Sequence, residues 1–186
     1  MEADIEKCYK ILSKGGVILY PTDTVWGIGC DATNQKAVDK IYKIKKREET
    51  KSMIILLDDV LKLEFYVEQV PPIAFDLINK YDNPLTIIYP KAKNLSKNVI
   101  AKDGSIAIRI VRDEFCKRML NIFNKPIVST SANISGQETP LTFSKISKDI
   151  IKKMDYVVEY GQDVVSHKAS KIIKLSERDD FKVVRQ

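Results

Sequence analysis

The feature that most constrains the fold is a series of short apolar runs, each bounded by polar or turn-forming residues. The run from Val17 to Tyr20, for example, is stopped by Pro21. Runs this short are typical of buried strands rather than of helices. We therefore predict strands at 17–20, 53–57, 85–89, 106–110, 127–129, 156–159, 171–175 and 181–185.

Amphipathic stretches separate these strands. In the stretch 34–46, apolar side chains recur at helical spacing and Asn34 is a candidate N-cap. We predict helices near 5–12, 34–46, 60–68, 72–80, 113–123 and 143–154. Helices that alternate with strands over short connections indicate an α/β or mixed α+β fold. Neither a repeat nor a linker interrupts the pattern, so one domain over residues 1–186 is expected.

Composition narrows the class of protein. The chain has 31 Lys and Arg against 25 Asp and Glu, a net charge of +6. This charge fits a protein that handles phosphates or nucleic acid, although an ordinary basic surface would give the same value. The cysteines form no CxxC pair, and one histidine, His167, cannot build a histidine-rich metal site. The N-terminus is too charged for a signal peptide, so a cytoplasmic protein without membrane contact is expected.

Polar side chains follow two of the predicted strands. Residues 20–27, YPTDTVWG, come directly after the first strand, where ligands bind in many α/β sheets. Residues 126–136, PIVSTSANISG, offer hydroxyl and backbone donors to phosphate or carboxylate oxygens. The alternative for both segments is a turn whose side chains bond only to their own backbone.

Two positively charged features are candidate anion sites. In an extended segment, Lys45 and Arg47 would point the same way and clamp a polyphosphate, whereas the alternative is a solvated helix end. Arg109 lies on an otherwise apolar strand, GSIAIRI. Because an unpaired buried cation is costly, we expect Arg109 to meet an anion or a carboxylate, a structural salt bridge being the alternative.

Several catalytic signatures are missing. The chain has no Walker A loop, no Rossmann glycine fingerprint and no GxSxG elbow. Nothing in the sequence indicates a protein nucleophile. The polar residues instead suit substrate positioning and charge stabilisation, which carry much of phosphoryl and nucleotidyl transfer.

Taken together, these segments resemble the YrdC-like family of threonylcarbamoyl-AMP synthases in its short, single-domain form. The match begins near residue 8 and runs to the end of the chain. The blocks PTDTVWGIGCDA and STSANISG are its most specific parts. The resemblance implies a YrdC/RibB-like fold, a strongly twisted mixed sheet with flanking helices around a large basic cavity.

The resemblance also implies a reaction. L-threonine, bicarbonate and ATP would give threonylcarbamoyl-AMP and pyrophosphate, with Mg²⁺ held by the ATP phosphates and not by the protein. A threonylcarbamoyl transferase would then pass the group to tRNA. The catalytic residues that the resemblance implies are Lys45, Arg47, Ser131 and Asn133. Those for ATP are Arg47, Lys51, Ser105, Ser131, Thr139 and Arg185. Those for threonine are Thr24, Arg109, Ser129 and Ser170.

The chain departs from the family pattern at several positions. Residues 82–86 read DNPLT where many relatives have PGPLT, and Val111 stands where a proline is usual. Leu56 replaces a histidine of some relatives, and Lys171 replaces a threonine of most.

Two other functions remain open at this point. One is a domain that binds nucleotide, or weakly binds RNA, without making the adenylate. The other is the carbamoyl-handling module of hydrogenase maturation proteins, but the chain lacks the cysteine array that accompanies such modules.

Overall fold

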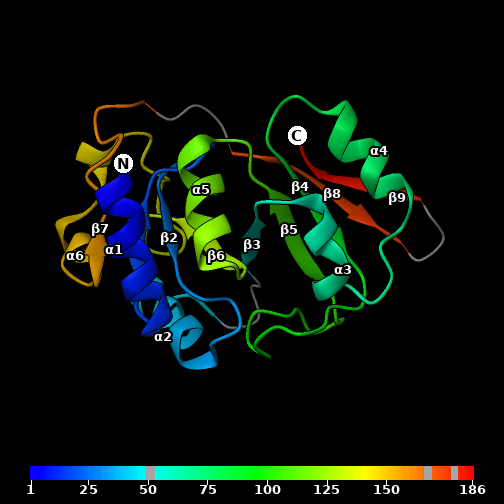
Figure 1. Cartoon of the computed structure of the whole chain (residues 1–186), viewed down its shortest axis with the longest axis horizontal. Coiled ribbons are helices and arrows are strands. Elements are labelled where there is room, and N and C mark those ends of the chain that lie inside the picture. The colour runs from blue at the N-terminus through cyan, green and yellow to red at the C-terminus, as the bar shows by residue number, and fades with distance from the viewer. Residues whose placement is uncertain (49–52, 166–168, 177–179) are drawn as a thin grey trace.

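A mixed β-sheet organises the chain, as the computed structural model shows for residues 1–48, 53–165, 169–176 and 180–186 (Figure 1). Within these residues nine strands follow the order β7-β1-β2-β6-β3-β5-β4-β8-β9. Their bounds are β1 (Ile18–Tyr20), β2 (Gly27–Gly29), β3 (Ile54–Leu57), β4 (Leu85–Tyr89), β5 (Ile106–Ile110), β6 (Ile127–Ser131), β7 (Tyr156–Val157), β8 (Lys171–Leu175) and β9 (Phe181–Arg185).

The pairing explains how distant segments come together. The β7–β1, β3–β5 and β4–β8 pairs are parallel, and the other neighbouring pairs are antiparallel. Strand β6 lies between β2 and β3, with Ser131 opposite Gly27 and Ser129 opposite Ile54. The two polar segments that follow β1 and β6 in sequence therefore meet within one sheet. The fold class that the sequence predicts is confirmed.

Helices pack on both halves of this sheet (Figure 1). They are α1 (Glu2–Ser13), α2 (Gln35–Lys45), the 3-10 turn η1 (Val60–Lys62), α3 (Leu63–Tyr66), α4 (Ile73–Lys80), α5 (Glu114–Phe123), the 3-10 turn η2 (Phe143–Lys145) and α6 (Lys148–Ile151). Asn34 caps α2 as predicted, since its side chain accepts a hydrogen bond from the Ala37 amide. In the described parts of the chain, no helix is long and apolar enough to traverse a lipid bilayer.

Several predicted bounds are shifted, for example at β7, which ends at Val157, and three larger differences concern whole elements. Strand β2 was not predicted, because its glycines give no alternating side-chain pattern. The helix expected at 143–154 is interrupted at Ile146, whose backbone is extended, and Ser147 then caps the separate helix α6. The stretch 60–68 forms η1 and α3, with Val67 already extended.

The glycines of β2 allow a close approach of backbones. A Cβ atom at Gly29 would lie 2.6 Å from the Val128 carbonyl oxygen and 2.7 Å from the Tyr20 ring. The first contact is with the backbone of a neighbouring strand, which cannot give way as a flexible side chain can. Gly29 therefore permits β2 to lie between Tyr20 and β6.

We predict that Gly29→Ala lowers the free energy of unfolding by about 1–3 kcal/mol, because the added methyl group overpacks the sheet. Urea denaturation would measure the change. Gly27→Ala is the matched comparison, since its Cβ would lie 3.1 Å from the movable Ser129 hydroxyl and should cost less. Equal losses in the two variants would contradict this explanation.

Candidate active site

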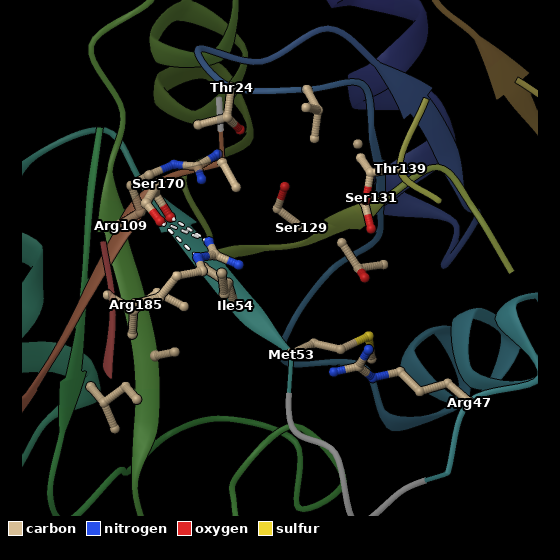
Figure 2. A pocket seen from close by; sticks show the side chains of 17 residues that line it. Thr24, Arg47, Met53, Ile54, Arg109, Ser129, Ser131, Thr139, Ser170 and Arg185 are labelled. Carbon is tan, nitrogen blue, oxygen red and sulfur yellow. Dashed lines mark hydrogen bonds between the residues drawn. The ribbon is translucent and has the colours of Figure 1, made fainter. Parts of the chain in front are cut away.

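A cavity of about 320 Å³ opens over the middle of the sheet (Figure 2). Its lining draws on β2, β3, β4, β5, β6, β8 and β9 and on the loops beside them. The apolar lining includes Ile54, Ile88, Ala107 and Ile172. The sequence-predicted site residues that line it are Thr24, Arg47, Arg109, Ser129, Ser131, Thr139, Ser170 and Arg185. Residues from the whole length of the chain thus converge on one cavity.

The loop between β1 and β2 holds Thr24 at the cavity wall. The Thr22 hydroxyl accepts a hydrogen bond from the Thr24 amide at 3.1 Å and donates one to the Val25 carbonyl at 2.7 Å. The Thr22 and Thr24 hydroxyl oxygens are 3.0 Å apart, and Thr24 is buried. The loop is therefore a self-bonded turn, as one interpretation of the sequence had it, and this turn presents Thr24 to the cavity.

Three guanidinium groups give the cavity its charge. Arg47 follows α2, Arg109 lies on β5 and Arg185 lies on β9. No acidic side chain is found among the described lining residues. Burial lowers the pKa of Arg47 and of Arg185, and the charge of Arg109 adds to the effect on Arg185. Arg47 and Arg185 are thus incompletely solvated cations in the lining of one cavity, which favours an anionic ligand.

Arg185, the last residue of β9, forms part of the cavity wall. Its Nε and Nη2 atoms donate hydrogen bonds to the Ser170 carbonyl oxygen at 3.0 and 2.8 Å (Figure 2). The Ser170 hydroxyl lies 2.7 Å from that of Thr86 on β4. Strands β4 and β9 are thereby connected through the segment that leads into β8, and the guanidinium of Arg185 is fixed against the cavity.

Lys45 lies outside the cavity lining, which corrects the expectation that it and Arg47 point the same way. The segment is not extended, because Lys45 is the last residue of α2 and Lys46 is left-handed with φ 48°. The buried Nζ of Lys45 donates to the carbonyl oxygens of Ser131 at 2.5 Å and of Asn133 at 2.6 Å. Lys45 therefore supports the loop after β6, whereas Arg47 reaches the cavity (Figure 2).

The loop after β6 is held in a second way. The Ser135 amide donates to the Lys45 carbonyl oxygen at 2.9 Å, so side chain and backbone of one residue both contact the loop. Burial, and to a smaller degree the charge of Arg47, lower the pKa of Lys45 to about 8. Lys45 is thus a buried amine whose charge is poorly solvated and whose donors go to main-chain carbonyls.

Two other sequence-predicted residues, Asn133 and Ser105, are not among the described residues that line the cavity. The Asn133 side chain donates to the Ile134 and Gln137 carbonyl oxygens and so closes its own loop. The Ser105 hydroxyl donates to Asp103 at 2.6 Å, in the turn before β5. Lys51 lies outside the described residues. The roles given to these three residues stay predictions.

The departures from the family pattern also avoid the cavity. Leu56 is buried in the core, and Val111 donates its backbone N–H to the Leu57 carbonyl oxygen at 2.9 Å. A proline at 111 has no N–H to donate. The Lys171 ammonium lies 3.1 Å from the Tyr81 hydroxyl and over the Tyr81 ring. None of the three is among the described lining residues.

Sequence reasoning missed one charged residue of this region. Asp23 forms an ion pair with Arg109 at 3.1 Å between Oδ1 and Nη2. The sequence placed Asp23 in the turn after β1 but gave no sign that this turn reaches β5. Among the described residues, no group of three or more His, Cys, Asp or Glu side chains has the arrangement of a metal site.

Comparison with known proteins agrees with this arrangement. The Sua5/YciO/YrdC family model, described as "Telomere recombination", matches residues 10–186. A threonylcarbamoyl-AMP synthase of Pseudoalteromonas translucida is 35% identical over 161 residues, which cover 85% of this chain and 86% of that protein. A threonylcarbamoyl-AMP synthase of Psychromonas ingrahamii is 34% identical over 150 residues, covering 79% and 78%.

Solved structures show the same fold. P. abyssi Sua5 complexed with L-threonine matches with a TM-score of 0.87 and 26% identity, covering 95% of this chain and 52% of that chain. The chain therefore spans about half the length of the P. abyssi protein. E. coli YciO matches with a TM-score of 0.86 and 26% identity, covering 100% and 90%. From its sequence and its fold, the chain belongs to the Sua5/YciO/YrdC family.

Proposed function

We propose that the chain is a threonylcarbamoyl-AMP synthase, a nucleotidyltransferase that forms threonylcarbamoyl-AMP and pyrophosphate from L-threonine, bicarbonate and ATP for tRNA modification. The observation that carries the proposal is the cavity in which Arg47, Arg109 and Arg185 converge with the Thr24 hydroxyl. The names of the two synthase relatives and the L-threonine complex of P. abyssi Sua5 support it.

The chemistry requires several anions to be close together. The threonine amine attacks bicarbonate and yields a carbamate with loss of water. A carbamate oxygen then attacks the α-phosphorus of ATP, and the bond to pyrophosphate breaks. Fixed cations in a partly dry cavity offset the repulsion among the carboxylate, the carbamate and the triphosphate.

The proposed site residues form two groups, one for each of the two larger substrates. Thr24, Arg109, Ser129 and Ser170 would bind threonine. Arg47, Ser131, Thr139 and Arg185 would bind the nucleotide, with Lys51 and Ser105 as further candidates. Lys45 acts as a positioning residue, because it holds the carbonyl groups of Ser131 and Asn133 and does not itself line the described cavity.

Magnesium would enter with ATP. Mg²⁺ is usually bound by one or two carboxylates together with phosphate oxygens. The described cavity lining contains no carboxylate, so the phosphate oxygens of ATP would supply the ligands. Bound there, the ion would neutralise charge on the departing pyrophosphate.

The product would pass to a threonylcarbamoyl transferase that acts on tRNA, in the cytoplasm, and the chain would work as one domain. The alternative of a nucleotide- or RNA-binding domain without turnover predicts ligand binding but no pyrophosphate.

The direct test is pyrophosphate release by the purified protein with ATP, Mg²⁺ and bicarbonate, with and without L-threonine. We expect release that depends on both threonine and bicarbonate. ATP binding without such release would reject the synthase function and favour the binding alternative.

We predict that Arg47→Ala lowers kcat/KM for pyrophosphate release about 10- to 100-fold, because it removes charged hydrogen bonds worth about 1.5–3 kcal/mol in total. The melting temperature should change little, since Arg47 is only half-buried. Lys117→Ala, at an exposed position of α5 outside the cavity lining, is the control for loss of one positive charge. Equal rates in the two variants would remove Arg47 from the site.

We predict a pH-dependent stability difference between the wild type and Lys45→Met. The pKa of Lys45 is about 8 in the folded protein, below its ordinary value of 10.5. Below pH 8 the ammonium is charged in both states, and the cost of burying it is present in full. As the pH rises above 8, the folded state loses this proton first and the cost is relieved.

The free energy of unfolding of the wild type should therefore rise relative to Lys45→Met between about pH 8 and pH 10. Urea denaturation of both proteins across this range measures the difference. A difference that stays constant with pH would show that Lys45 titrates normally.

A further inference from the structure

The ion pair between Asp23 and Arg109 joins two distant parts of the sheet. Asp23 lies in the loop between β1 and β2, whereas Arg109 lies on β5. Strands β2, β6 and β3 separate β1 from β5 in the sheet. The loop therefore reaches over the sheet, and both side chains end up almost fully buried, with 10% and 4% of their surfaces exposed.

This pair is close but incompletely hydrogen-bonded. Oδ1 of Asp23 lies 3.1 Å from Nη2 of Arg109, yet that oxygen has no hydrogen bond of good geometry in the described part of the chain. The Nε of Arg109 is buried and also lacks a partner there. A buried ion pair that serves stability alone gains from saturating its donors and acceptors, and this pair does not do so.

The position of Arg109 suggests a function for its incompletely hydrogen-bonded guanidinium group. Arg109 lines the cavity, and it is placed opposite Thr86 of β4 and Leu56 of β3 in the sheet. A guanidinium carries five N–H donors in a fixed plane, so a partner on one edge determines where the other edge points. Asp23 occupies one edge through Nη2.

The same contact fixes the neighbouring residue. Thr24 follows Asp23 directly and lies at the cavity wall. The Thr22 hydroxyl holds Thr24 within the loop, but it makes no connection to β5. The ion pair with Asp23 connects this loop to the strand that carries Arg109.

We propose that Asp23 is a positioning residue for the amino-acid substrate: its carboxylate orients the guanidinium of Arg109 toward the substrate carboxylate and keeps Thr24 in register with it. This proposal rests on the proposed synthase function, because it takes threonine as the ligand of Arg109. Asp23 itself contacts neither the substrate nor the reacting atoms.

The electrostatics of Asp23 agree with this role. Burial raises the pKa of Asp23, and the charge of Arg109 opposes that rise. An aspartate in such a place is costly unless its cation is present. Its removal would leave Arg109 as a buried cation with a less defined direction.

The test compares Asp23→Asn with the wild type. Asparagine keeps the shape of the side chain and removes its charge. Calorimetric titration with L-threonine and with ATP, together with kcat and both KM values from pyrophosphate release, would separate the two substrates. We expect the affinity and the KM for threonine to worsen about tenfold, with ATP affinity within twofold of the wild type.

Asp113→Asn is the matched control. Asp113 is a neighbouring half-buried carboxylate that caps α5 through the Cys116 amide, and asparagine is an equally good N-cap. Burial raises the pKa of Asp113 too, so both substitutions neutralise a desolvated acid close to Arg109. Threonine binding should be unchanged in this variant.

A double-mutant cycle with Arg109→Lys supplies a readout that a purely structural role would not move. If Asp23 acts through Arg109, the losses in threonine affinity from Asp23→Asn and Arg109→Lys will not add. Should Asp23→Asn fail to fold, Asp23→Glu keeps the charge on a longer stem and should weaken threonine alone, by about threefold.

The outcomes are distinct. Additive losses, an unchanged threonine affinity in Asp23→Asn, or parallel losses for threonine and ATP would each overturn the role of Asp23. A wild type that binds threonine but releases no pyrophosphate would reject the synthase function, while the binding data would still decide the positioning role. A wild type that binds no threonine would reject both.

Discussion

The double pairing of β6 determines everything else about the site. This strand bonds to β2 on one side and to β3 on the other, so it joins the two halves of the sheet. Ser129 and Ser131 lie two residues apart on it and therefore face the same side. Gly27 and Ile54, their partners across the ladder, also line the cavity. A slip of one residue in either pairing would turn the hydroxyls into the core.

Positive charge is the second constraint, and it carries a cost. Three arginines line one cavity, and the buried Lys45 lies behind the loop after β6. Three of these cations are stabilised by different partners. Arg185 donates to the main chain of Ser170, Arg109 pairs with Asp23, and Lys45 donates to two loop carbonyls. Backbone carbonyl oxygens thus accept the hydrogen bonds of Arg185 and Lys45. Because these oxygens carry no full negative charge, the cavity keeps its positive charge.

Sequence reasoning recovered the elements that have a strong local signal. The apolar runs predicted eight of the strands, and Asn34 predicted the start of α2, because these features depend on neighbours in the chain. The cavity residues on β5, β6 and β9 were anticipated through family resemblance and line one cavity.

What the sequence could not reveal depends on tertiary contacts. Strand β2 owes its place to glycines whose lack of a side chain matters only against Tyr20 and Val128. The separation of Arg47 from Lys45 depends on the left-handed turn at Lys46, a conformation that lysine seldom adopts. The partnership of Asp23 and Arg109 spans 86 positions of sequence, and no periodic pattern reports a contact over that distance.

The cavity wall formed by β9 differs from the other walls in its local stability. Strand β9 is the last strand at the edge of the sheet, and every one of its residues is exposed. An edge strand held by one neighbour opens at a lower free energy than strands in the middle of a sheet. Because Arg185 belongs to β9, the cavity can lose one of its three cations through a local fluctuation while the core strands keep their pairing. Opening of this edge of the cavity and global unfolding thus depend on separate parts of the same sheet.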